Sequence, residues 1–117
     1  MDVIIAVHDA KLRYAISVLA QEQPGWHVTG SVESLSELNK VLKLVSPEMI
    51  IIDVDLPGFD PKLIELDFDS FGNRIIYLVP TPINQIPAGY RNSPSRVWIS
   101  KLESPESLVE IFRHFSK

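Results

Sequence analysis

A run of apolar residues that ends on a carboxylate is the strongest constraint that this sequence places on its fold. Residues Met49–Val54 read MIIIDV, and Pro57-Gly58 follows shortly after them. A short apolar run bounded by turn residues predicts a strand buried on both faces, and Pro-Gly predicts a turn out of it. Open α/β sheets bind ligands outside the carboxyl ends of their strands. Asp53 is therefore a candidate functional residue, although aspartate at a strand end also serves local roles in solvation and capping.

Strand and helix patterns alternate along the rest of the chain. Apolar or alternating segments predict further strands at 3–7, 26–32, 74–79 and 96–99. Apolar side chains at helical spacing predict helices over 10–22, from 34 to about 45, and over 108–115. Asp9 and Ser34 are suited to cap the first two helices, and Pro105 is suited to the first turn of the last. This rhythm predicts an α/β fold with right-handed crossovers and a parallel sheet.

Two connections interrupt the pattern. Between 60 and 73, Pro61 can start a helix, but residues 68–72 have the composition of a loop. Between 79 and 96 the chain carries several helix-breaking residues, namely Pro80, Pro82, Pro87, Gly89 and Pro94. Because a proline inside a helix costs roughly 3 kcal/mol, we predict that the fourth helix is short or irregular. We expect its apolar side chains to pack back onto the sheet, because they would otherwise form an exposed patch: Ile83, Ile86 and Tyr90.

Length and composition favour one globular domain spanning 1–117. A chain of 117 residues with 45% hydrophobic residues is long enough for one core and too short for two. Its net charge of -4 and the lack of a basic stripe argue against direct nucleic-acid binding. It contains no cysteine, which excludes disulfides and thiolate zinc sites. Since it shows neither a signal-peptide pattern nor an apolar stretch of transmembrane length, we expect a cytoplasmic protein without membrane contact.

Taken together, these patterns resemble the receiver domain of bacterial response regulators. The resemblance rests on the order of the elements, on the strand Ile50–Asp53 with Leu56–Asp60 after it, and on the late Lys101, and it covers nearly the whole sequence. Leu12-Arg13 and the segments 23–28 and 104–108 are most similar to receivers attached to LuxR-type DNA-binding domains. The resemblance implies a flavodoxin-like (βα)5 fold, in which a five-stranded parallel sheet is the middle layer of a three-layer sandwich.

For function, the resemblance implies a two-component signalling protein that receives a phosphoryl group from a histidine kinase. It allows either a free-standing receiver or the N-terminal part of a longer regulator with an output domain, such as a DNA-binding domain, outside this segment, and it is compatible with a homodimer. Asp53 would be the phosphoacceptor, and Lys101 would neutralise the charge that develops on the phosphoryl oxygens. A single lysine after a strand is otherwise an ordinary solvated side chain.

The sequence departs from the family's pattern at the metal site. The paired acidic residues that hold magnesium in the family fall on Val7 and His8, and neither supplies the oxygen ligands that this hard cation prefers. Asp53, Asp9 and the backbone carbonyl of Asp55 remain as candidate ligands, although for Asp9 we favour the competing role of helix cap. We therefore expect weak magnesium binding, no other cofactor, and slow phosphorylation.

A second departure lies at the switch positions. The family's Thr or Ser at the end of the fourth strand falls on Val79, which cannot hydrogen-bond a phosphoryl group. The aromatic residue that responds to it falls on Trp98. Trp98 either covers apolar surface beside the fifth strand, which we favour, or anchors a protein–protein interface.

His8 has three alternative roles. We favour a hydrogen bond or ion pair to Asp53 or Asp9, ahead of plain solvent exposure. A transition-metal site ranks last, because His27 and His114 belong to other predicted elements.

These observations predict an atypical receiver domain that acts through protein–protein contacts and is not an enzyme in the usual sense. One alternative is a phosphorylation-independent scaffold or localisation domain, like the receiver-like domain of pilus-localisation ATPases. Another is an ordinary phosphorylation switch that recruits Asp9 as a metal ligand. A flavin-binding or small-molecule module is disfavoured, because residues 8–11 contain no glycine and no phosphate cradle.

Overall fold

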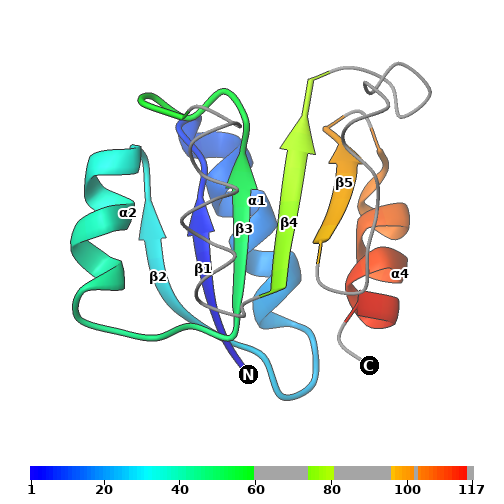
Figure 1. Ribbon diagram of the computed structural model, residues 1–117. Helices are drawn as coiled ribbons and strands as arrows, with labels where there is room; N and C mark the ends of the chain where they lie inside the picture. Colours follow the sequence, from blue (N-terminus) through cyan, green and yellow to red (C-terminus); the bar gives the residue numbers. More distant parts are fainter. Residues whose placement is uncertain (60–73, 81–95, 102, 116–117) are drawn as a thin grey trace.

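Five parallel strands form a single sheet in the computed structural model, which describes residues 1–59, 74–80, 96–101 and 103–115. The strands are β1 (Asp2–Ala6), β2 (His27–Val32), β3 (Met49–Asp53), β4 (Arg74–Val79) and β5 (Arg96–Ser100). Their order across the sheet is β2-β1-β3-β4-β5, and every neighbouring pair is parallel (Figure 1). The predicted parallel sheet is confirmed, and each strand lies within one residue of its expected bounds.

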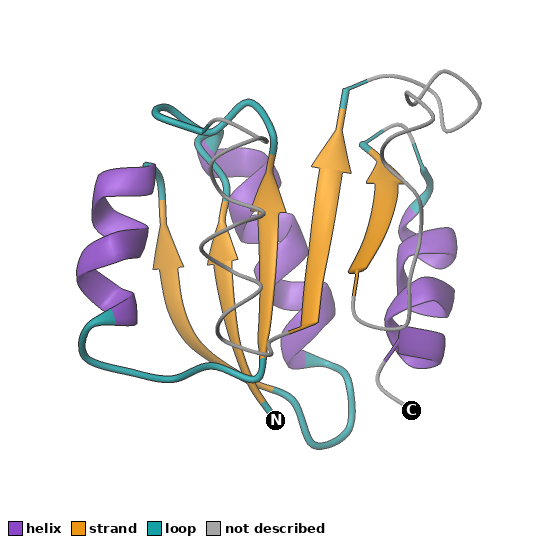
Figure 2. Ribbon diagram, viewed as in Figure 1, coloured by secondary structure: helices purple, strands orange, loops and turns teal. Residues whose placement is uncertain are grey.

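Helices cover both faces of this sheet (Figure 2). α1 (Ala10–Gln21) and α4 (Pro105–Phe115) pack on one face, where Ile16 and Phe112 join a buried apolar cluster with residues from all strands except β2. α2 (Leu35–Leu42) packs on the other face, where Leu38 belongs to a second cluster. Helices on both faces of a parallel sheet give the predicted three-layer α/β sandwich.

Burial from two sides explains the apolar run in β3. Successive side chains of a strand point to opposite faces, so Ile50 and Ile52 lie in the α2 layer while Met49 and Ile51 lie in the layer of α1 and α4. All four are fully buried. Since burial of apolar surface contributes about 25 cal/mol per Å², apolar residues are favoured at every position of this strand except its end.

Local signals set the starts of α1 and α2. The Asp9 carboxylate accepts a hydrogen bond from the Leu12 N–H at 3.1 Å, and Ser34 Oγ accepts one from the Glu37 N–H at 3.2 Å. Each bond satisfies one of the N–H groups that a helix leaves unpaired in its first turn. Both predicted N-caps are therefore confirmed.

The end of α2 differs from the prediction. The helix ends at Leu42, and Val45 is exposed instead of completing its apolar face. Pro47 lies five residues beyond the helix end. Proline disfavours helical backbone in the preceding residue and offers no N–H to a further turn, so Pro47 prevents a further helical turn beyond this segment. The assignment of Val45 to the helix face was wrong.

Parallel strands bring the candidate residues to one edge of the sheet. The carboxyl ends of β1, β3, β4 and β5 carry or directly precede Val7, Asp53, Val79 and Lys101 (Figure 1). The predictions for 60–73 and 81–95, including the short fourth helix and the packing of Ile83, Ile86 and Tyr90, lie outside the described residues. Within the described ranges, no helix combines the length and apolar character needed to cross a membrane.

Candidate functional site

Asp53 is the last residue of β3 and is almost fully buried, with 2% of its surface exposed. Its Oδ1 accepts a hydrogen bond from the backbone N–H of Asp55 at 2.9 Å. This turn-type bond holds the carboxylate at the strand end, where the chain leaves the sheet. A charged group buried this deeply needs partners, because the loss of water is otherwise costly.

Lys101 is the charged partner of Asp53. Its Nζ lies 2.7 Å from Asp53 Oδ2 and 3.0 Å from Asp55 Oδ2. The Lys101 side chain is 19% exposed, whereas that of Asp55 is 61% exposed, so the three groups span the boundary between core and solvent. Asp53 and Lys101 were predicted site residues, and the structure brings them together; Asp55 was predicted to contribute only its backbone carbonyl, whereas its carboxylate also contacts Lys101.

The charge state of Lys101 follows from these contacts. Burial lowers the pKa of the ammonium group, because it disfavours the charged form. The hydrogen bonds to Asp53 and Asp55 and the charges of these carboxylates outweigh that effect and raise the pKa above the usual 10.5. Lys101 therefore carries a full positive charge at neutral pH.

The end of β1 is organised by an arginine instead of by acidic residues. Val7 is fully buried in the apolar cluster beneath α1 and α4. Arg13 Nη1 donates to the carbonyl oxygens of Val7 and His8, at 2.9 and 3.0 Å. The same atom lies 3.8 Å from a carboxylate oxygen of Glu33. This guanidinium was not singled out as a site residue, since nothing in the sequence indicates that it folds back over the preceding loop.

His8 and Asp9 form their hydrogen bonds with groups other than Asp53. His8 is exposed, and its Nδ1 lies 3.2 Å from the carbonyl oxygen of Glu33, not beside Asp53 or Asp9 as we had favoured. The Asp9 carboxylate caps α1. Sequence reasoning ranked solvent exposure second for His8, and the structure agrees with that alternative.

These contacts decide how well the residues fit a magnesium ion. Val7 offers no side-chain oxygen, the carbonyls of residues 7 and 8 accept from Arg13, and the carboxylates of Asp53 and Asp55 bond to Lys101. Across the part of the chain that the structure describes, no three His, Asp or Glu side chains gather in a way that could hold a metal. Among the described residues, the end of β1 therefore contributes few of the oxygen ligands that an octahedral magnesium shell needs, and the Lys101 ammonium lies against Asp53.

The two switch positions are both buried in the α2 layer. Val79 and Trp98 are 6% and 3% exposed and belong to the same apolar cluster. The indole ring stacks on Tyr77 at 3.9 Å between centroids, with 11° between the ring planes. Trp98 therefore packs in the core, as the favoured alternative predicted, and it does not project from the surface as an interface anchor would.

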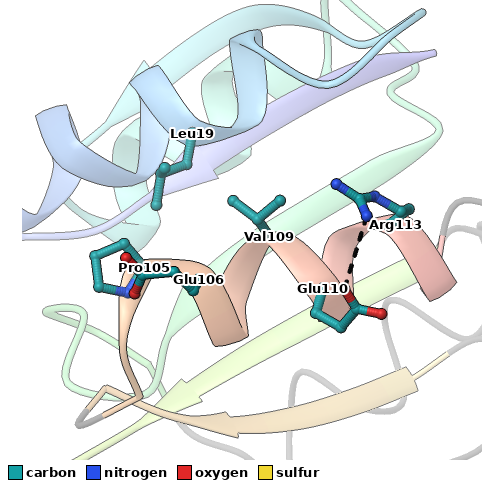
Figure 3. A pocket seen from close by; sticks show the side chains of 6 residues that line it. All are labelled: Leu19, Pro105, Glu106, Val109, Glu110 and Arg113. Atoms are coloured by element: carbon teal, nitrogen blue, oxygen red, sulfur yellow. Dashed lines mark ion pairs between the residues drawn. The ribbon is translucent and has the colours of Figure 1, made fainter.

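A separate groove of about 430 Å³ runs between α1 and α4 (Figure 3). Its apolar lining includes Leu19 and Val109, and Glu110 lies 3.7 Å from Arg113 at its side. None of the residues around Asp53 lines it. The groove is thus distinct from the candidate site.

Comparisons with known proteins bear on the fold. Neither a protein-family model nor a curated protein matches this sequence. Among solved structures, the response regulatory domain of protein mrkE from Klebsiella pneumoniae aligns with a TM-score of 0.81 at 16% identity, over 99% of this chain and 95% of that one. A LuxR-family DNA-binding response regulator from Staphylococcus aureus aligns with a TM-score of 0.76 at 19% identity, over 99% and 98% of the two chains.

A longer regulator matches over part of its length. The Salmonella typhimurium RcsB response regulator aligns with a TM-score of 0.77 at 20% identity, over 99% of this chain but only 60% of its own. At these identities the likeness establishes the architecture. With a five-stranded parallel sheet, helices on both faces and a buried aspartate at the end of β3, this chain has the fold of a response regulator receiver domain.

Proposed function

We propose that this chain is the receiver domain of a two-component response regulator and that Asp53 is its phosphoacceptor. One observation supports the proposal above all: the buried Asp53 carboxylate pairs with Lys101 at 2.7 Å, at the carboxyl edge of a sheet with the receiver fold. The phosphodonor is a histidine kinase, and the output passes through protein contacts in the cytoplasm. The domain turns over no substrate of its own, and it acts either as a free-standing receiver or together with an output domain, such as one that binds DNA, outside this segment.

The proposed chemistry uses groups that already touch each other. Asp53 Oδ2 attacks the phosphorus of a phosphohistidine, a P–O bond forms, and the P–N bond breaks. The imidazole nitrogen keeps the electron pair and takes a proton from solvent. Lys101 moves from Oδ2 to a phosphoryl oxygen, where its charge offsets the negative charge of the transition state. Asp55, 3.0 Å from Nζ, keeps the ammonium beside the reacting group during this exchange.

Phosphorylation is slow in this proposal, and it depends little on magnesium. At the end of β1, Val7 and His8 stand where the family's metal-binding acids would lie, and the nearby backbone carbonyls accept from Arg13. Loss of one electrostatic partner of a transition state typically costs about 10²–10³ in rate. Lys101 is left as the main source of positive charge at Asp53.

A scaffold that works without phosphorylation is the second candidate. Val79 offers no hydroxyl to a phosphoryl group, and Trp98 is already buried against Tyr77. Both features favour an output that is independent of Asp53. In this alternative, self-association measured by sedimentation is the same with and without a phosphodonor.

Intact-mass spectrometry after treatment with acetyl phosphate, with and without magnesium, tests the proposal. We expect a slow gain of one phosphoryl group by the wild-type chain and none by Asp53→Asn. Asp2→Asn is the matched control, because it removes an exposed carboxylate at the opposite end of the sheet and should still be labelled. Equal labelling of Asp53→Asn would refute the phosphoacceptor, and fast magnesium-dependent labelling would refute the slow site. No labelling of any variant would favour the scaffold.

A further inference from the structure

We propose that Tyr77 is a positioning residue that fixes Trp98 inside the core, so that the indole keeps one position whether or not Asp53 carries a phosphoryl group. The inference rests on the proposed function, because it concerns how a change at Asp53 is transmitted to β4 and β5. Three features of the aromatic cluster around Tyr77 support it.

The first is the close stack between neighbouring strands. Tyr77 and Trp98 are directly paired in the parallel ladder of β4 and β5, so their side chains leave the sheet on the same face. Their rings are nearly parallel, 3.9 Å apart between centroids. Tyr77 is fully buried and Trp98 is 3% exposed. An indole that leaves this position would expose its own surface and one face of the Tyr77 ring.

The second feature is that Tyr77 is itself held in place. Arg96 Nη1 donates a hydrogen bond to the Tyr77 hydroxyl at 2.7 Å. Phe59 packs its ring against Tyr77 at 6.4 Å in an edge-on arrangement. A ring with a bonded hydroxyl, one stacked face and an edge contact has little freedom to move aside. Trp98 therefore packs against a fixed surface.

The third feature is Val79, which lies two residues after Tyr77 and shares its face of β4. Val79 is 6% exposed and packs in the same cluster as Trp98. Its side chain has no polar atom that could move toward a phosphoryl group on Asp53. Outward movement of Trp98 would leave a cavity beside Val79 and Tyr77 without a compensating hydrogen bond. The buried position is thus the favoured one in both states of Asp53.

The test follows Trp98 in the intact chain. Trp26 and Trp98 are the two tryptophans of the sequence, so labelling with 5-fluorotryptophan gives one fluorine signal for each. Trp26→Phe assigns the signals and retains an aromatic contact with Phe112, whose ring lies 5.3 Å from that of Trp26. The sample is treated with acetyl phosphate, and its intact mass reports the fraction modified. We expect the Trp98 signal to keep its position and its protection from solvent in the modified fraction.

Two substitutions at Tyr77 isolate the stack. In the Trp26→Phe background, Tyr77→Leu removes the stacked ring, and we expect acrylamide quenching of Trp98 fluorescence to rise severalfold. Tyr77→Phe keeps the ring but loses the bond from Arg96, and we expect quenching to stay low. Circular dichroism checks that each variant is folded. Equal quenching in the two folded variants would overturn the inference.

Quenching and fluorine measurements on Trp26→Phe, in which Tyr77 is intact, test the inference even if Tyr77→Leu does not fold. Strong quenching of Trp98 fluorescence in Trp26→Phe would overturn the inference without bearing on Asp53. A Trp98 fluorine signal that shifts and becomes accessible to solvent in phosphorylated protein would overturn the inference while supporting Asp53 as phosphoacceptor. If Asp53 takes up no phosphoryl group, the proposed function fails, and low quenching that rises with Tyr77→Leu still supports the role of Tyr77. The two failures are therefore distinguishable.

Discussion

The backbone N–H of Lys101 donates a hydrogen bond to the carbonyl oxygen of Val79 at 2.7 Å. This bond extends the β4–β5 ladder by one residue beyond the pair formed by Val79 and Ser100. It places Lys101 just after β5, and from there its side chain extends across the end of β4 to Asp53 at the end of β3. The main chain of β4 at Val79 therefore holds the backbone of Lys101 in the position from which its ammonium group reaches Asp53.

Removal of the Lys101 ammonium should destabilise the fold. Lys101→Met leaves the buried Asp53 carboxylate without its charged partner, which costs about 3 kcal/mol for a largely buried pair. Urea denaturation measures the change in the free energy of unfolding. Asp55→Asn is the matched control, because its exposed carboxylate should contribute less than about 1 kcal/mol. In the double variant Asp53→Asn/Lys101→Met the cost should be well below the sum of the single costs, and strict additivity would show that the pair is not coupled.

The raised pKa of Lys101 predicts how stability depends on pH. A group whose folded-state pKa lies above its unfolded value binds more protons in the folded state. Its contribution is fully present below the usual 10.5 and is lost as pH rises through the raised folded value. Denaturation midpoints should therefore fall as pH rises from about 10.5 through the raised folded-state value, and Lys101→Met should lose less stability over the same range. A loss of stability confined to neutral pH would contradict the raised pKa of Lys101.

Acidic substitutions at the end of β1 should lower the free energy of unfolding by unequal amounts. Val7 is fully buried among apolar side chains, so Val7→Asp should cost about 3 kcal/mol or more. His8 is exposed, so His8→Asp should change stability by less than about 0.5 kcal/mol.

Calorimetry with magnesium then tests the family's metal site. The double variant Val7→Asp/His8→Asp, if folded, should bind magnesium more tightly than the wild-type chain, because it restores carboxylate ligands. Asn39→Asp/Ser46→Asp adds the same two negative charges at exposed positions in and after α2 and is the control for charge alone. Tight binding by the wild-type chain would contradict the poor fit that we infer.

Asp9 should behave as a helix cap. Asp9→Ala removes the acceptor of the Leu12 N–H and should cost about 1 kcal/mol, whereas Asp9→Ser keeps a capping oxygen and should recover most of it. Thermal denaturation compares the two, and Ser34→Ala at the cap of α2 serves as a reference of similar size. If Asp9 were a metal ligand instead, both Asp9 variants would abolish magnesium binding without this difference in stability.

Local patterns account for much of the fold and for part of the site. The apolar run through β3 required a strand covered on both faces, and the turn residues after it placed Asp53 at the strand end. Asp9 and Ser34 cap the helices that their side-chain chemistry predicts. The end of α2 was placed about three residues too late, because the apolar spacing continues to Val45 although the helix ends at Leu42.

By itself, then, the sequence determined which segments are strands and helices, and it determined that a carboxylate ends the central strand, because both depend on neighbours in the chain. Tertiary structure alone decided what meets that carboxylate. Lys101 reaches Asp53 only because β4 and β5 are paired in one particular register, and Tyr77 stacks on Trp98 for the same reason. Arg13 bonds to the carbonyls of Val7 and His8 only because α1 packs back over the end of β1. Lys101 and Asp53 are far apart in the sequence, as are Tyr77 and Trp98, while Arg13 contacts the loop that precedes its own helix. Only the packing of the strands and helices brings these groups within contact distance.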